Sequence, residues 1–237
     1  TQCHILQALG GAQEQVVSCL AQAGVPKPVN RLCVVALAVP VGSVAYALPP
    51  VAGSPDACSE PDCQLTKREI RAVTLSSLAP RAGEVLWDVG GGAGSVGIEW
   101  MLADPTCRTI AIEHVPERVA RIARNAQALG VPTLQTIEGK APAAFAGLPA
   151  PDAIFIGGGG SAAGMLEAAW SALKPGGRLV VNAVVVETEL TLFQAMQEWG
   201  GSLTRLDVAR LDPVGRLHAF RPGMSVTQWV VWKPARA

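Results

Sequence analysis

The residues whose types and spacing best support chemistry form a glycine-rich run, Asp88–Gly94, with the sequence Asp-Val-Gly-Gly-Gly-Ala-Gly. An apolar run, Val85–Val89, leads into it and predicts a buried strand, and Ser95–Leu102 continues with helical spacing. Glycine lets the backbone approach a ligand closely and adopt the unusual dihedral angles of a tight turn. The helix N-terminus beyond the turn presents free N–H groups to an anionic group. This order of strand, glycine turn and helix is typical of a nucleotide-binding βαβ unit.

Two classes of enzyme use this design, and the residues fit both in part. Gly92–Gly97 matches G-x-G-x-x-G, the dinucleotide pattern of NAD-dependent oxidoreductases, and Glu113 follows at the distance of a ribose acceptor. Asp88–Gly94 also matches D-x-G-x-G-x-G, which resembles the first motif of Rossmann-like S-adenosyl-L-methionine (AdoMet) methyltransferases. A buried carboxylate at Asp88 would oppose a pyrophosphate, whereas AdoMet carries an amino group and a sulfonium. We therefore predict a methyltransferase with AdoMet as cofactor, and the NAD-dependent oxidoreductase is the alternative.

Four strand ends supply candidate binding residues, because the ligand of an open α/β sheet lies beyond the carboxyl ends of its strands. For AdoMet, Glu113 would accept from both ribose hydroxyls, and Lys140 and Ala141 would border the adenine. The glycine run would approach the methionine part through Asp88, Gly90, Gly91, Gly92, Ala93 and Gly94. Gly157 and Gly158 follow another predicted strand, where methyl acceptors usually enter. The Asn/Asp-Pro-Pro-aromatic motif of nucleobase methylation does not follow that strand, so base methylation is disfavoured.

A second cluster of candidates lies near the C-terminus, where positive charges outnumber negative ones. Between positions 203 and 226 there are only two acidic residues, both aspartates. The basic residues of the same stretch are Arg205, Arg210, Arg216, His218 and Arg221. Beside a glycine-lined mouth, this strand-to-strand loop could bind a polycarboxylate acceptor through charge-assisted pairs, for which Arg216, His218 and Arg221 are the candidates. A solvated basic loop is the alternative. No catalytic acid–base pair is identified, because methyl transfer from a sulfonium mainly requires alignment of donor and acceptor.

Composition limits the partners of the chain. It has 237 residues, 49% of them hydrophobic, and a formal net charge of zero, so no global charge favours nucleic acid or a membrane surface. Apolar runs stay shorter than a transmembrane helix. The six cysteines form no C-x-x-C pair and have no histidine at metal-ligand spacing. We therefore predict free thiols, no metal, no nucleic acid, no membrane and a location in the reducing cytoplasm.

Apolar runs and breakers predict alternating strands and helices from residue 66 onward. Thr66 and Glu69 fit a capping box for a helix that Pro80 stops, and Pro116 fits the first position of a later helix. The other predicted helices are 117–129, 162–173 and 187–199, and the other strands are 107–113, 134–137, 153–156, 178–185, 203–211 and 225–232. No helix separates the last two strands, so they should be antiparallel. The fold class is therefore α/β, a Rossmann-like methyltransferase with a seven-stranded, mostly parallel sheet and an antiparallel C-terminal strand pair.

Residues 1–60 differ in kind from the rest. Ile5–Gly11 is predicted as a helix end with a glycine stop, Gln13–Ala23 as a second helix, and Leu32–Val39 as a strand. A Pro-rich linker then follows. We predict that residues 1–60 are the tail of a larger domain or a degenerate appendage, and that 61–237 form the methyltransferase domain.

Five motifs in order resemble the decarboxylating domain of the precorrin-6Y C5,15-methyltransferase family of cobalamin biosynthesis. The resemblance covers about residues 62–234, and its two most specific stretches are Leu65–Glu69 and Phe155–Gly160. The motifs are Gln64–Arg71, Asp88–Gly94, Glu138–Pro142, Phe155–Gly160 and Leu173–Arg178.

The resemblance implies AdoMet-dependent methylation of a precorrin at C15, coupled to loss of CO₂ from the C12 acetate side chain. It implies donor contacts from Thr66, Gly90–Gly94, Glu113 and Ala141, whereas relatives often carry Asp where this chain has Lys140. Residues 1–60 would be the remnant of a preceding tetrapyrrole methylase domain, and C5 methylation is not assigned to the chain. Single-domain relatives imply a homo-oligomer, a tetramer. Methyl transfer to another small-molecule or protein acceptor, and a non-catalytic AdoMet-binding subunit, are the alternatives.

Overall fold

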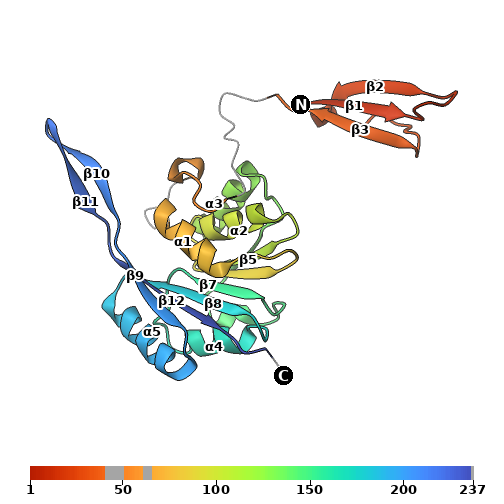
Figure 1. Cartoon of the computed structure of the whole chain (residues 1–237). Helices are drawn as coiled ribbons and strands as arrows, with labels where there is room; N and C mark the ends of the chain where they lie inside the picture. The colour runs from red at the N-terminus through yellow and green to blue at the C-terminus, as the bar shows by residue number, and fades with distance from the viewer. Residues whose placement is uncertain (41–50, 61–65, 236–237) are drawn as a thin grey trace. The chain divides into compact units, whose positions relative to one another are not determined.

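The computed structural model describes residues 1–40, 51–60 and 66–235 (Figure 1). The chain divides into two compact units, Thr1–Ala47 and Leu48–Ala237, which are described separately. Among the described residues, no helix has the length and apolar character needed to cross a bilayer.

The first unit is a three-stranded antiparallel sheet in the order β2-β1-β3. Its strands are β1 (Gln2–Gln7), β2 (Gln15–Leu20) and β3 (Cys33–Ala38), and a 3-10 turn, η1 (Ala21–Ala23), follows β2. The strand predicted at Leu32–Val39 is confirmed. The two helices predicted before it are wrong, because burial in β1 alternates through Cys3, Ile5 and Gln7, the period of a strand paired on both edges.

The second unit is built on a seven-stranded sheet, and this confirms the predicted fold class. The strand order is β6-β5-β4-β7-β8-β12-β9; the first five are parallel, and β12 is antiparallel to both β8 and β9. The strands are β4 (Val85–Val89), β5 (Arg108–Glu113), β6 (Gln135–Glu138), β7 (Ala153–Ile156), β8 (Arg178–Ala183), β9 (Ser202–Leu206) and β12 (Val226–Trp232).

Helices cover both faces of this sheet. One face carries α1 (Arg68–Leu78), α2 (Ser95–Ala103) and α3 (Pro116–Ala128), and the other carries α4 (Met165–Ala172) and α5 (Val186–Trp199) (Figure 1). Two short 3-10 turns, η2 (Asp56–Cys58) and η3 (Ala143–Phe145), complete the unit. Two apolar cores result, because successive residues of the buried strands point to opposite faces. Pro116 occupies the start of its helix as predicted.

The capping box predicted for α1 is wrong. The helix N-cap is Lys67, and its side chain makes no capping hydrogen bond. Both residues of the expected box make other contacts: the Thr66 backbone carbonyl accepts from Arg71, and the Glu69 carboxylate accepts from Arg210 at 2.5 Å. A charged partner holds Glu69 more strongly than the helix N-terminus would.

The region between residues 203 and 226 is more ordered than the predicted strand and basic loop. The strand predicted at 203–211 divides into β9 and β10 (Ala209–Val214), and β10 forms a hairpin with β11 (Leu217–Pro222). Figure 1 shows this hairpin extending away from the sheet. The predicted loop is therefore wrong, because alternating polar and apolar residues continue through it and pair as an antiparallel ladder.

Candidate functional site

The carboxyl ends of four parallel strands bring most of the predicted site residues together. Each following loop is held to its neighbour by a backbone hydrogen bond. The Gly90 N–H donates to the Ile112 carbonyl at 2.9 Å, and the Gly157 N–H donates to the Val89 carbonyl at 3.0 Å. The Gly139 N–H donates to the Glu113 carbonyl at 3.0 Å. The loops after β4, β5, β6 and β7 therefore meet at one edge of the sheet, where an open α/β fold binds its ligand.

The glycine loop needs its glycines for two physical reasons. Gly90, Gly92 and Gly94 have φ values of 74°, 57° and 79°, in the left-handed region that other residues rarely adopt. Space is also short: a Cβ at Gly94 would lie 2.9 Å from Ile122 Cγ2, and one at Gly90 would lie 3.3 Å from the Gly158 backbone nitrogen. The loop is therefore packed against α3 on one side and against the loop after β7 on the other.

Glu113 ends β5 and is 3% exposed. Its Oε1 accepts from the backbone N–H groups of His114 and Val115 at 2.9 and 3.0 Å, and its Oε2 accepts from the Gly92 N–H at 3.2 Å. His114 Nδ1 lies 3.1 Å from Oε1. A carboxylate has about four lone-pair sites, so Oε2 retains capacity for one further donor. The arrangement suits one ribose hydroxyl on Oε2 better than the predicted contact through both oxygens.

Asp88 lies near the end of β4, and its predicted contact with the donor stays a prediction. The residue is buried, and its Oδ2 accepts from the Gly97 N–H at 3.0 Å, inside the first turn of α2. Burial raises the pKa of the Asp88 carboxyl to about 7; the Gly97 hydrogen bond opposes this rise, and the nearby charge of Glu113 adds to it. Asp88 therefore fixes the start of α2, directly after the glycine loop.

Asn125 is a site residue that the sequence analysis missed. It lies on α3 and is buried, and its Nδ2 donates to the Ala93 carbonyl in the glycine loop at 2.9 Å. Ile122, three residues earlier on the same helix, packs against the glycines of the loop. The i, i+3 spacing of an apolar residue and an asparagine was a usable signal, because both positions lie on one face of the predicted helix.

The remaining predicted donor contacts lie at the rim. Lys140 is exposed, and its carbonyl accepts from the Ala144 N–H at 3.1 Å. Ala141 is half-buried against the core of the α4–α5 face. Thr66 is half-buried just before α1, and residues 61–65 lie outside the described part of the chain. Their roles in donor binding stay predictions.

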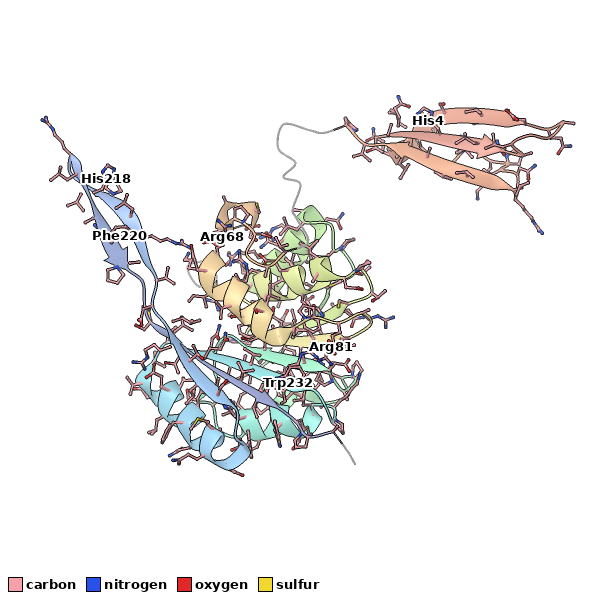
Figure 2. The ribbon with its side chains drawn as sticks, viewed as in Figure 1. His4, Arg68, Arg81, His218, Phe220 and Trp232 are labelled. Carbon is pink, nitrogen blue, oxygen red and sulfur yellow. The ribbon has the colours of Figure 1, made fainter. Side chains whose placement is uncertain are left out.

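The predicted acceptor residues fall into two groups that the structure does not bring together. Gly157 and Gly158 lie at the sheet edge, and nothing comes within 4 Å of a Cβ built on Gly158. Arg216, His218 and Arg221 lie on the hairpin, and Figure 2 shows His218 near its outer end. Their roles in acceptor binding also stay predictions.

The hairpin begins at the site edge of the sheet, because Thr227 of β12 pairs with Ala183 at the carboxyl end of β8. Near its base, Arg210 contacts Asp56 at 3.3 Å and Glu69 at 2.5 Å. The hairpin is thereby fastened to the N-terminus of α1 and to the segment before it.

Across the described ranges, no cluster of His, Cys, Asp and Glu could hold a metal ion. Cys3, Cys19, Cys33, Cys58 and Cys107 are free, and Cys63 lies outside those ranges.

Comparison with known proteins gives one consistent group. A family model described as "Precorrin methyltransferase domain" matches residues 57–233. A precorrin-6Y C(5,15)-methyltransferase (decarboxylating) from Sinorhizobium sp is 56% identical over 95% of this chain and 54% of its own length. A cobalt-precorrin-6B C(15)-methyltransferase (decarboxylating) from Salmonella typhimurium is 32% identical over 68% of this chain and 85% of its own length. The chain thus spans about half the length of the longer curated relatives that it matches.

Solved structures agree with the sequence relatives. The C-terminal domain of precorrin-6Y C5,15-methyltransferase from Rhodobacter capsulatus superposes with a TM-score of 0.74 at 42% identity, over 78% of this chain and all of that one. A SAM-dependent O-methyltransferase from Thermotoga maritima, with a TM-score of 0.60 and 18% identity, shares the fold.

Proposed function

Since the chain belongs to the precorrin methyltransferase domain family, we propose that it binds AdoMet and methylates a precorrin at C15. In the same reaction, the C12 acetate side chain of the precorrin loses CO₂. The observation that carries the proposal is the glycine loop beside Glu113, at the edge where the family's sheet binds its donor. The names of the relatives supply the reaction and the class of acceptor.

The residues at the sheet edge suit the polar groups of AdoMet. The glycines of the loop offer the ligand backbone without side chains, and Glu113 Oε2 has capacity for a ribose hydroxyl. Lys140 and Ala141 border the place of the adenine. Bound there, AdoMet supplies an activated methyl group, and the chain has to hold the acceptor carbon in line with it.

The acceptor enters beside Gly157 and Gly158, where a Cβ built on Gly158 would meet nothing within 4 Å. Loss of CO₂ from an acetate on a conjugated macrocycle leaves an electron pair that the ring can delocalise. The same conjugation makes a meso carbon nucleophilic. A precorrin carries many carboxylates, which favours contacts from Arg216, His218 and Arg221 over a purely solvated role. Methylation of another small-molecule or protein acceptor is the alternative function.

We also propose that the chain forms a homo-oligomer, a tetramer, through the β10–β11 hairpin. An isolated two-stranded hairpin is marginally stable in water, yet this one exposes large apolar side chains. Leu217 is 74% exposed and Phe220 is 72% exposed, and Leu211 pairs with Phe220 on the ladder. A second copy of the chain would cover them. We also propose that the chain is located in the cytoplasm.

For the N-terminal unit we propose the end of a tetrapyrrole methylase domain. The family model begins at residue 57, but the alignment with the Sinorhizobium relative covers 95% of the chain, which takes in much of residues 1–60. The apolar residues of β3 are exposed, as expected of a strand taken from a larger sheet. C5 methylation is not part of the proposal.

Calorimetric titration of the chain with S-adenosylhomocysteine, with NAD as the parallel control, tests the proposed donor. Micromolar binding of the first and none of the second is expected, and a turnover assay with the precorrin would follow. NAD binding alone would favour the oxidoreductase alternative. S-adenosylhomocysteine binding without turnover on the precorrin would favour another acceptor or a non-catalytic subunit.

A further inference from the structure

We propose that Asn125 is a positioning residue of the donor site, and that through it the segment 51–60 is tied to the glycine loop. The inference rests on the proposed function, because the loop is taken as the donor-binding element. Asn125 is 3% exposed, lies on α3 and contacts both parts with its one side chain. Its Nδ2 donates to the Ala93 carbonyl at 2.9 Å, and its Oδ1 accepts from the Glu60 N–H at 2.8 Å.

The Ala93 carbonyl is a place where the loop conformation can be fixed. Ala93 precedes Gly94, the N-cap of α2, and its carbonyl belongs to the peptide whose N–H donates to Gly91 at 2.7 Å. The hydrogen bond from Asn125 therefore fixes the opposite end of the same peptide plane. Rotation of this peptide would break both bonds and move the start of α2. A buried amide that satisfies two backbone groups at once is costly to replace.

The segment before α1 is fastened to the same elements. The Glu60 carboxylate accepts from Arg124 Nε and Nη2, both at 2.9 Å. Farther back, the N–H groups of Gly53 and Ser54 donate to Glu99 of α2 at 2.7 and 2.9 Å. The segment thus contacts α3 and α2, the two helices that flank the glycine loop. Movement of the segment at Glu60 would be transmitted to Ala93 through the Asn125 side chain.

The test compares Asn125→Asp with Gln127→Glu, the same amide-to-carboxylate change at an exposed position of α3, by titration with S-adenosylhomocysteine. Aspartate has the size of asparagine and still accepts from the Glu60 N–H, but in its ionised form it cannot donate to the Ala93 carbonyl. We expect binding about tenfold weaker, the effect of one lost hydrogen bond to a buried carbonyl. Gln127→Glu changes only an exposed side chain, so its affinity should stay within about twofold of the wild-type value.

Two further results separate the inference from the proposed function. If the wild-type chain does not bind S-adenosylhomocysteine, the proposed function fails and this inference fails with it. If the wild-type chain binds and a folded Asn125→Asp chain binds equally well, only the inference is overturned. A loss in Gln127→Glu as large as in Asn125→Asp would also overturn it, because the defect would then not be specific to the loop contact.

Hydrogen exchange on the wild-type chain gives a readout that does not depend on a folded variant. Bound S-adenosylhomocysteine should slow exchange of the Glu60 amide together with amides of the glycine loop, as measured by NMR. Protection of the loop amides with no change at Glu60 would overturn the proposed tie between the segment and the loop.

Discussion

Replacement of Asp88 by asparagine should remove a pH dependence of stability that the buried carboxyl imposes. Burial raises the pKa of Asp88 from its ordinary value near 3.8 to about 7. The folded chain therefore holds this proton more tightly than the unfolded chain does. The stability that this group contributes is fully present below about pH 4 and is lost as the pH rises toward 7.

The magnitude follows from the same two values. A rise from about 3.8 to about 7 corresponds to up to roughly 4 kcal/mol of unfolding free energy across this pH range. In Asp88→Asn the side chain keeps an oxygen for the Gly97 N–H and carries no titrating proton. The free energy of unfolding of the variant, minus that of the wild type, should therefore increase from pH 4 to pH 7 and then level off.

Urea unfolding followed by tryptophan fluorescence measures this difference in the right part of the molecule. All six tryptophans lie in the second unit, at positions 87, 100, 170, 199, 229 and 232. Other carboxyls titrate in both chains and cancel in the difference. If the difference in unfolding free energy is constant between pH 4 and pH 7, Asp88 has an ordinary pKa and the account of its burial is refuted.

Three further predictions test the site, the segment before it and the hairpin. Glu113→Ala should weaken S-adenosylhomocysteine binding by about 1–3 kcal/mol, whereas Glu138→Ala, at the paired position on β6, should not; equal affinities would contradict the ribose contact. Arg71→Met should lower the unfolding free energy in urea by about 3–5 kcal/mol, because it leaves the buried Glu99 without its cation; a loss below about 1 kcal/mol would contradict this. Leu217→Asp should lower the mass measured by light scattering, while Val186→Asp, equally exposed on α5, should not; an unchanged Leu217→Asp assembly would exclude the hairpin contact.

The second unit was predictable because its signals are local. The parallel strands β4, β7 and β8 contain short apolar runs, and the strand predicted at 153–156 has the observed bounds, Ala153–Ile156. The glycine loop was found because only glycine tolerates its φ values, so sequence and geometry are directly linked there. The family resemblance adds four motifs outside the glycine loop that support the same conclusion.

The errors arise where partners distant in sequence decide the structure. Gln15–Leu20 was predicted as helix, but this stretch is a strand because it pairs with β1, and that pairing has no local signal. The hairpin at 209–222 was missed as structure because it buries neither face within the chain. Asn125 was missed because its partners, Ala93 and Glu60, are 32 and 65 residues away.

The structure also changes the reason for preferring AdoMet over a dinucleotide. The sequence argument relied on a charged Asp88, yet the carboxyl is buried against the Gly97 N–H and its pKa of about 7 lowers its charge near neutral pH. Repulsion of a pyrophosphate by Asp88 is therefore weaker than the sequence argument assumed. Glu113 of β5 and Asn125 of α3 hold the glycine loop, and Asp88 of β4 holds the start of α2 directly after it.

A loop and helix start held in this way before any ligand arrives lose little conformational freedom on binding, so Asp88 and Glu113 act largely by pre-organisation. The motif therefore constrains the shape of the cradle more than the charge of the ligand. The choice of donor then depends on features outside the cradle: the one free position of Glu113 Oε2, the antiparallel β12 that separates this sheet from the usual dinucleotide fold, and the family to which the chain belongs.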